Sequence, residues 1–170
     1  MATPSAHALR IVEFEPRWRD DFARLNLEWL RRWFVVEPVD AEVLGDPEGH
    51  ILADGGRVLF ALDAAGEHAI GTVALRHDGD GVYEMTKMAV EPGQRGTGVG
   101  RALVLAAIDT YQSLGGRELY LESSSILTPA LKLYESAGFV HHPAPRPGSH
   151  YARADVHMVW VPPAAVGACA

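Results

Sequence analysis

Three glycines stand between an expected strand and an expected helix, in the segment RGTGVG that runs from Arg95 to Gly100. Glycine lets the backbone take positive φ angles and leaves room for a ligand to approach the amides. The first amides of the following helix have no partners inside the helix, and the helix dipole adds partial positive charge. Together these features predict a site for a phosphate or pyrophosphate, to which Arg95 and Arg101 add charge.

Spacing separates this turn from two better-known phosphate motifs. The dinucleotide pattern G-x-G-x-x-G places its third glycine one residue later than Gly100. A nucleotide P-loop has Lys followed by Ser or Thr after its last glycine, where this chain has Arg101. Glycine clusters also serve as flexible turns that allow close packing, so the turn by itself leaves both interpretations open.

Two further side chains, Tyr134 and Glu84, have the chemistry needed for proton transfer, because a phenol can donate a proton and a carboxylate can accept one. Tyr134 follows helical spacing with the apolar residues Ala130 and Ala137, so its own surroundings indicate a core tyrosine. Glu84 lies four residues before Met88 in an expected strand, and strand alternation would place both side chains on one face.

Hydrophobic periodicity and turn residues predict the elements that must position these side chains. We expect strands over residues 8–14, 58–62, 68–75, 82–90, 118–123, 139–142 and 155–161, and helices over 16–36, 40–44, 98–114 and 128–137. The strands over 58–62, 68–75 and 82–90 are joined by tight turns and are expected to form an antiparallel meander. The order predicts an α+β fold, a mixed, mostly antiparallel sheet of about six or seven strands with helices on both faces.

The chain length and composition are those of an ordinary globular protein. Of 170 residues, 48% are apolar and 22% are charged. We therefore expect one domain over residues 1–170, with a core over about 8–161 and a flexible tail over 162–170. The single cysteine, Cys169, has no partner for an internal disulfide. No apolar run suffices to span a bilayer and no secretion signal is seen, so the expected location is the cytoplasm.

Charge and histidine spacing argue against two kinds of ligand. The formal net charge of -7 disfavours nonspecific binding to nucleic acid, because phosphate needs a basic surface. His141 and His142 are adjacent in an expected strand and therefore point to opposite faces. No further histidine or cysteine completes a zinc set at the usual spacing, so we expect no metal.

The segment Arg95-x-x-Gly98-x-Gly100 resembles the acetyl-CoA-binding motif Q/R-x-x-G-x-G/A of the GNAT superfamily of N-acetyltransferases. The preceding strand, EMTKMAV over 84–90, is similar to the fourth strand of the family. The segment LYESAGF over 133–139 is similar to its L-Y-x-x-x-G-F segment. The order of elements also agrees, so over roughly residues 58–161 the chain is identified as a member of this superfamily.

The resemblance implies acetyl-CoA as co-substrate and a splayed pair of parallel strands, 82–90 and 118–123, with the pantetheine arm between them. A bulge near Met88 would free backbone groups for the cofactor. An amide aimed at the thioester oxygen would stabilise the developing oxyanion. The implied cofactor contacts are Met88, Ala89, Val90, Arg95, Gly96, Thr97, Gly98, Val99, Gly100 and Arg101.

The implied reaction is direct attack of an amine on the acetyl thioester in a ternary complex. The amine must lose a proton, since its pKa resembles the ~10.4 of lysine, and the departing thiolate must gain one. The resemblance places Tyr134 beside the sulfur as the acid. It makes Glu84 either the base, directly or through water, or an anchor for the cationic amine. Leu127 stands where many relatives carry a pantetheine-contacting Asn, with serines at 123–125 just upstream.

The expected acceptor is a primary amine of a small molecule or an amino-acid-like compound. A protein N-terminal or lysine acetyltransferase and a noncatalytic acyl-CoA sensor are the alternatives. Candidate acceptor contacts are Trp33, at the end of the first long helix, and Arg153, before the last strand, together with Glu84. A homodimer is common in the family, and the sequence leaves this point open.

Overall fold

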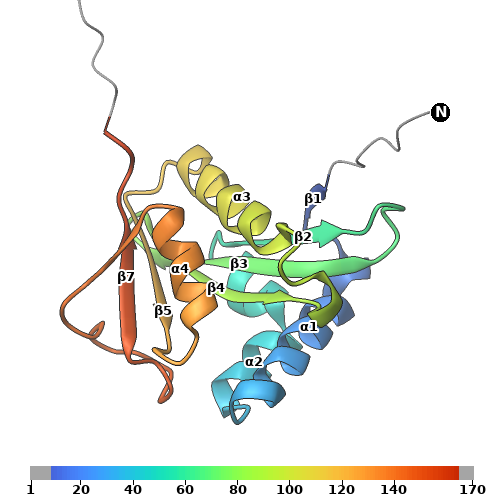
Figure 1. Cartoon of the computed structure of the whole chain (residues 1–170), viewed down its shortest axis with the longest axis horizontal. Coiled ribbons are helices and arrows are strands. Elements are labelled where there is room, and N and C mark those ends of the chain that lie inside the picture. Colours follow the sequence, from blue (N-terminus) through green and yellow to red (C-terminus); the bar gives the residue numbers. More distant parts are fainter. Residues whose placement is uncertain (1–8, 165–170) are drawn as a thin grey trace, which may run out of the picture.

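A mixed sheet of seven strands runs through the molecule in the order β1-β2-β3-β4-β5-β7-β6 (Figure 1). The structure is a computed structural model and describes residues 9–164. All neighbouring strands are antiparallel except β4 and β5. The strands are β1 (Arg10–Glu13), β2 (Arg57–Leu62), β3 (Ala69–Gly79), β4 (Val82–Val90), β5 (Glu118–Ser123), β6 (Phe139–His141) and β7 (Val156–Trp160). The predicted α+β sheet is confirmed.

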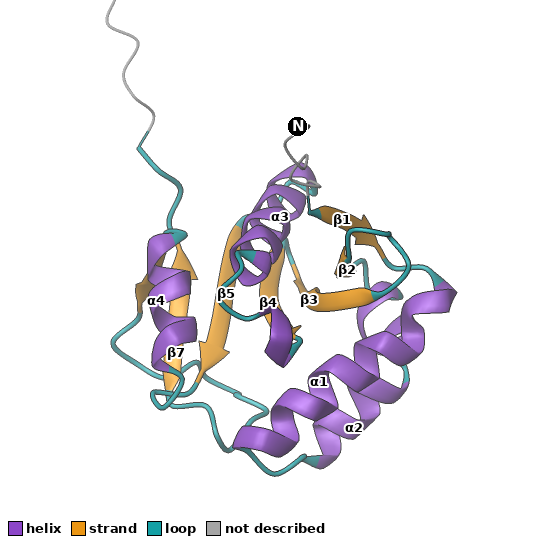
Figure 2. Ribbon diagram, turned by 45° about the vertical axis from the view of Figure 1, so that its right-hand side comes forward, coloured by secondary structure: helices purple, strands orange, loops and turns teal. Residues whose placement is uncertain are grey.

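Helices cover both faces of this sheet, as Figure 2 shows. They are α1 (Arg19–Trp33), α2 (Pro38–Gly45), α3 (Val99–Ser113) and α4 (Thr128–Ser136). Shorter helical turns span Pro16–Trp18, Glu48–Leu52 and Pro92–Gln94. Helix α3 packs on β2, β3 and β4, whereas α1 packs on β3 and β4 from the opposite face.

Strand alternation divides the core between these two faces. Leu75 of β3 belongs to the cluster under α3 with Leu103, whereas its neighbour Ala74 belongs to the cluster under α1 with Phe22 and Phe60. Burying one such Leu or Phe side chain contributes about 1.5–3 kcal/mol. The helices are therefore fixed to the sheet from both sides, and the strand ends between them have defined positions.

The parallel pair β4 and β5 separates part-way along its length. Its register is Val82 with Glu118, Tyr83 with Leu119 and Glu84 with Tyr120, and the pairing stops there. Beyond this point β4 continues beside β3, and β5 continues beside β7. Figure 1 shows the two halves of the sheet turning away from each other. The predicted splayed pair is thus confirmed, and the separation opens a gap between the strands.

A bulge interrupts β4 at Lys87 and Met88. Thr72 pairs with Ala89 but Ala74 pairs with Thr86, so Lys87 and Met88 together oppose one residue of β3. Lys87 has a φ of +51°, a left-handed conformation that is uncommon for a non-glycine residue. A bulge of this kind leaves backbone groups outside the ladder and re-aims the side chains that follow.

The bulge overturns one expectation from the sequence. Tyr83 and Met85 point into the cluster under α3, so Glu84 between them points to the opposite face. Met88 nevertheless packs against the α3 cluster. The prediction that Glu84 and Met88 share a face is therefore wrong, because an inserted residue reverses the alternation between them.

The structure describes only part of the predicted C-terminal tail. Residues 165–170, which include Cys169 and most of the predicted tail, lie outside the described residues. Within residues 9–164, no helix combines the length and apolar character needed to cross a membrane.

Candidate active site

The glycine turn leads directly into α3 and leaves backbone donors free. Gly96 and Gly98 have φ angles of +77° and +93°, where a side chain would be strained. Gly98 is the N-cap of α3, and the first helical hydrogen bond runs from Ala102 N to Gly98 O at 3.0 Å. The amides of residues 99–101 therefore have no partner within the helix and face outward with its positive dipole end.

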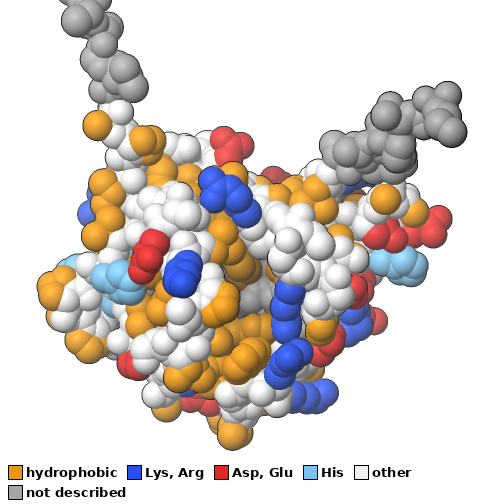
Figure 3. Space-filling view, in the orientation of Figure 1, with side chains coloured by type: hydrophobic (Ala, Val, Ile, Leu, Met, Phe, Trp, Pro, Cys, Tyr) orange, Lys and Arg blue, Asp and Glu red, His pale blue; other side chains and the backbone are white. Residues whose placement is uncertain are grey.

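A cavity of about 480 Å³, here called the glycine-turn pocket, lies beside this turn. Its walls come from the end of β4, the turn and α4, and Figure 3 shows an apolar hollow there with basic side chains on its rim. Of the ten cofactor contacts implied by the resemblance, eight line it: Met88, Ala89, Val90, Arg95, Gly96, Gly98, Gly100 and Arg101. The other two do not: Thr97 donates its hydroxyl to Gln94 O, and Val99 is buried in the core.

The space around the turn suits a bulky anion. A Cβ added at Gly96 or Gly98 would meet no atom within 4 Å, so the turn borders open space. At Gly100 a Cβ would come within 3.3 Å of Leu133, because α3 and α4 approach closely there. Free amides and two exposed guanidinium groups, of Arg95 and Arg101, fit the charge of a pyrophosphate.

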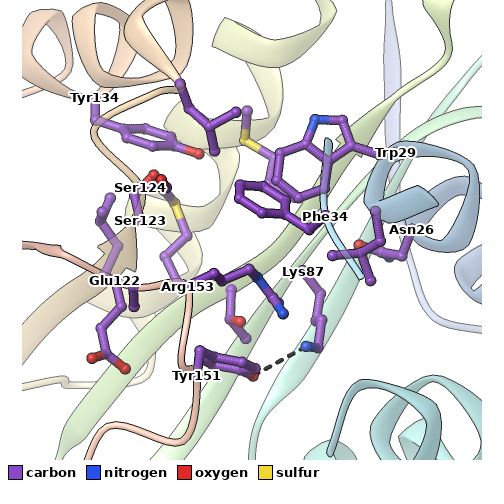
Figure 4. A pocket seen from close by; sticks show the side chains of 17 residues that line it. Asn26, Trp29, Phe34, Lys87, Glu122, Ser123, Ser124, Tyr134, Tyr151 and Arg153 are labelled. Carbon is purple, nitrogen blue, oxygen red and sulfur yellow. Dashed lines mark hydrogen bonds between the residues drawn. The ribbon is translucent and has the colours of Figure 1, made fainter. Parts of the chain in front are cut away.

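A smaller cavity of about 90 Å³, here called the interstrand pocket, fills the gap where β4 and β5 separate (Figure 4). Thr86 and Lys87 border it from β4, and Glu122 and Ser123 border it from β5. Helix α1 and the loop between β6 and β7 close it, through Asn26, Trp29, Phe34, Tyr151 and Arg153.

Four side chains line both pockets and so mark their junction: Trp29, Met88, Leu127 and Tyr134. The ring of Tyr134 packs edge-on against Phe139, with centroids 6.1 Å apart. No described residue makes a hydrogen bond with its hydroxyl. Burial raises the pKa of Tyr134 to about 12, so the phenol is protonated at neutral pH. Tyr134 therefore brings a free O–H group to the place where ligands of the two pockets would meet.

Glu84 lies close to the interstrand pocket but lines neither pocket. Its side chain is 1% exposed, and one carboxylate oxygen lies 2.8 Å from Arg76 Nη2 without hydrogen-bond geometry. Burial raises the pKa of Glu84 to about 7; Arg76 opposes this rise, whereas Glu122 and Asp78 add to it. Glu84 is thus a buried carboxylate with a labile proton, one strand away from Glu122.

Glu122 is the one acidic residue in the lining of the interstrand pocket. It follows Tyr120, the β5 partner of Glu84, by two residues and shares its face of the sheet. Glu122 also borders a polar cavity of about 290 Å³, lined by Arg76, Tyr120 and Arg146 among others. Glu122 therefore stands between the interstrand pocket and the polar cavity.

A buried ionic network forms one side of the interstrand pocket. Asp40 of α2 is fully buried and accepts hydrogen bonds from Lys87 Nζ at 2.8 Å and from both terminal nitrogens of Arg153 at 2.9 Å. Arg153 also donates to Glu37 at 2.7 Å. Burial alone would raise the pKa of Asp40, but hydrogen bonds from Arg153 and Lys87 lower it to about 2. Asp40 is therefore ionised at neutral pH.

A family model described as the acetyltransferase (GNAT) family matches residues 5–139, well over half of the sequence. The chain belongs to this family. An uncharacterized N-acetyltransferase of Schizosaccharomyces pombe is 33% identical to this acetyltransferase over 155 residues, 85% of this chain and 93% of that protein. A mycothiol acetyltransferase of Thermobispora bispora is 37% identical over 94 residues, which span 55% of this chain and 30% of that longer protein.

Solved structures agree with this family assignment. A GNAT-family acetyltransferase from Staphylococcus aureus has a TM-score of 0.80 at 19% identity, covering 90% of this acetyltransferase and 98% of that chain. An acetyltransferase from Bacillus subtilis, solved in complex with CoA, has a TM-score of 0.67 at 22% identity, covering 89% and 97%. At these identities the likeness concerns the fold alone.

The structure of this acetyltransferase brings some predicted site residues together and separates others. Tyr134, Met88 and the glycine turn surround one continuous space. Trp33 lines the glycine-turn pocket, 45% exposed, whereas Arg153 lines the interstrand pocket. Leu127 stands at the junction, and the upstream residues Ser123 and Ser124 line the interstrand pocket rather than the glycine-turn pocket.

Sequence reasoning missed four residues of the interstrand pocket and its walls: Asp40, Lys87, Glu122 and Tyr151. One local signal was available for Asp40. It is the N3 residue of α2 and forms a capping box with Glu37, a pairing that a separation of three residues can suggest. Lys87, Glu122 and Tyr151 come from elements far apart in sequence, and no local pattern joins them.

Proposed function

We propose that this acetyltransferase moves the acetyl group of acetyl-CoA onto the primary amine of a small molecule held in the interstrand pocket. The observation that carries this proposal is the junction of the two pockets at Tyr134 and Met88. A donor held by the glycine turn and an acceptor held between β4 and β5 meet only there. Holding two reactants in such an arrangement removes much of the entropic cost of a bimolecular reaction.

The residues present fit acetyl-CoA, which when bound supplies the activated acetyl thioester. In this proposal the amides of residues 99–101, with Arg95 and Arg101, hold the pyrophosphate. The stretch from Met88 to Val90 lines the route from the turn to the junction. Because β4 is unpaired with β5 beyond Glu84, backbone amides on that edge are free to bind the thioester oxygen. The CoA complex of the Bacillus subtilis acetyltransferase supports this assignment.

Side chains at and beside the junction carry out two proton transfers in this proposal. Tyr134 donates a proton on the sulfur side, since its hydroxyl is free and protonated. Glu122 accepts the proton of the amine through water and can pass it to the polar cavity. Glu84 stands behind Glu122 as a second carboxylate, so in this proposal it tunes or shares that proton without touching the acceptor.

The size of the interstrand pocket favours a small acceptor. At about 90 Å³, this space suits a compact amine better than an extended polypeptide segment.

The test is thiol release from acetyl-CoA with panels of small amines, amino acids, polyamines and peptides. We expect turnover with small amines, and Tyr134→Phe should lower kcat by about 100-fold with acetyl-CoA affinity within roughly twofold. Tyr111→Phe removes a phenol on α3 that lines neither pocket and serves as the control. Turnover confined to peptides would replace the small-molecule proposal, and binding of acetyl-CoA without any turnover would indicate a sensor.

The two carboxylates are separated by their pH profiles. Glu122→Gln should remove the acidic limb of kcat/KM if Glu122 is the proton acceptor, whereas Glu84→Gln should shift that limb without removing it. If instead Glu84→Gln removes the acidic limb and Glu122→Gln only shifts it, Glu84 is the base.

A further inference from the structure

One side of the interstrand pocket presents hydrogen-bond donors that the protein itself leaves unused. An ammonium has three N–H groups, and Lys87 uses two of them, on Asp40 and on the Tyr151 oxygen at 3.0 Å. A guanidinium has five, and Arg153 uses three, on Glu37 and Asp40. The Tyr151 hydroxyl accepts from Lys87 and donates to no described residue. Four donors therefore have no acceptor among the described residues: one N–H of Lys87, two N–H groups of Arg153 and the O–H of Tyr151.

The carboxylates that fix these cations stand behind them. Lys87, Tyr151 and Arg153 are in the lining of the pocket, whereas Asp40 and Glu37 are not. The pocket therefore faces the positive ends of buried ion pairs. Figure 4 shows the three side chains grouped on one side of the pocket, with Tyr134 on the opposite side.

This group is held rigidly before any ligand arrives. Lys87 Nζ lies 4.6 Å and Arg153 Cζ lies 4.7 Å from the centre of the Tyr151 ring, which gives two cation–π contacts on one aromatic side chain. Asp40 fixes both cations from behind. A site built in this way loses little side-chain entropy on binding, so a good part of the interaction energy appears as affinity.

The charge pattern selects among amines. A polyamine would place a second cation against Lys87 and Arg153, and like charges at close range are costly. An alkylamine without a carboxylate would leave the spare donors without acceptors. An acceptor with a carboxylate near its amine would satisfy the donors and leave the amine pointing toward Tyr134.

We propose that the interstrand pocket binds a free amino acid as a zwitterion, with its carboxylate on Lys87, Tyr151 and Arg153 and its amine directed to the junction at Tyr134. The reaction on that amine depends on the proposed function, but the binding does not. Carboxylate recognition thus makes Tyr151 and Arg153 determinants of acceptor specificity.

The test is a binding measurement that needs no turnover. Calorimetric titration of the full chain, with CoA present, should detect at least one of the twenty free amino acids. For that amino acid, its amide and its decarboxylated amine should bind at least tenfold more weakly, because each lacks the carboxylate. Loss of one hydrogen bond to a charged group raises the dissociation constant by roughly tenfold to hundredfold.

Two variants locate the carboxylate without dismantling the network. Tyr151→Phe keeps the ring between the two cations and removes only the hydroxyl, and Arg153→Lys keeps the charge and removes the fork. Both variants should bind the amino acid at least tenfold more weakly and should bind its amide with unchanged affinity. Tyr111→Phe makes the same chemical change as Tyr151→Phe outside both pockets and should alter neither ligand. Thermal unfolding of each variant checks that it is folded.

The outcomes separate this proposal from the proposed function. Equal binding of the amino acid and its amide, no binding of any amino acid, or loss of both ligands together in a folded Tyr151→Phe protein would each overturn the carboxylate site. Carboxylate-dependent binding without acetylation would support the site and contradict the acetyl-transfer proposal. Acetylation of alkylamines or polyamines in preference to amino acids would support acetyl transfer and overturn the carboxylate site.

Discussion

The two pockets of this acetyltransferase are built by different means. The glycine-turn pocket depends on backbone: left-handed glycines, free amides of α3 and the unpaired edge of β4. The interstrand pocket depends on side chains from α1, α2, β4, β5 and the loop before β7, joined by a buried ionic network. We expect the first kind of site to tolerate changes of the side chains around it, and the second to fail when one charged member is lost.

The largest effect is expected at the centre of the network. Asp40→Asn leaves Lys87 and Arg153 without their shared buried anion, and breaking a buried pair in this way costs about 3–5 kcal/mol. Urea denaturation should show this loss in the free energy of unfolding. Glu42→Gln changes an exposed carboxylate on the same helix and should stay within about 0.5 kcal/mol. Equal stability of the two variants would mean that the network does not hold the pocket together.

The buried carboxylate beside Glu122 should make stability depend on pH. The pKa of Glu84 rises from 4.5 to about 7 on folding, so the folded state binds more protons between these values. Stability should therefore be fully present below about pH 4.5, fall as the pH rises through 7, and level off above, with a loss of up to about 3 kcal/mol from this group.

Glu84→Gln should flatten that part of the curve when the free energy of unfolding is measured from pH 5 to 8. Glu28→Gln, at an exposed position of α1, should leave the curve unchanged. A Glu84→Gln curve parallel to that of the unmodified protein would show that Glu84 is ionised throughout this range.

Two glycines with similar backbone conformations allow the glycine-turn pocket to be tested against a control position. Gly98 in the turn has a φ of +93° and Gly79 at the end of β3 has a φ of +96°, and a Cβ would meet no atom within 4 Å at either. Alanine at each should cost about 1–2 kcal/mol of stability from left-handed strain. Only Gly98→Ala should also weaken acetyl-CoA binding, by about tenfold in calorimetry. Equal affinities would show that the turn does not hold the cofactor.

The smallest effect is expected from the exposed basic side chains of the turn. Arg95→Gln should raise the acetyl-CoA dissociation constant by roughly two- to fivefold at low salt, and less at high salt, because exposed charges are screened. Arg117→Gln, at an exposed turn away from both pockets, should have no effect. A loss far above tenfold for Arg95→Gln would mean that side chains rather than amides dominate this pocket.

The same contrast explains how far sequence reasoning reached. The order of helices and strands along the chain and the glycine turn were predicted because periodicity and turn residues encode them locally. The splayed pair was predicted from the resemblance carried by three spaced motifs. The face of Glu84 was predicted wrongly because one inserted residue at the bulge reverses strand alternation, and nothing in the strand sequence marks the insertion. Trp33 lines the glycine-turn pocket, and its contact with the acceptor stays a prediction.

The sequence alone determined the fold, the family and the backbone cradle at Arg95–Gly100, since those depend on short segments whose residues act on their neighbours in the chain. Only the tertiary structure decided which carboxylate borders the interstrand pocket and how Asp40, Lys87, Tyr151 and Arg153 combine. Lys87 and Arg153 meet Asp40 across 47 and 113 residues of chain. Contacts over such separations depend on how the sheet splits and which helix covers it, and these arise only when the whole chain has packed.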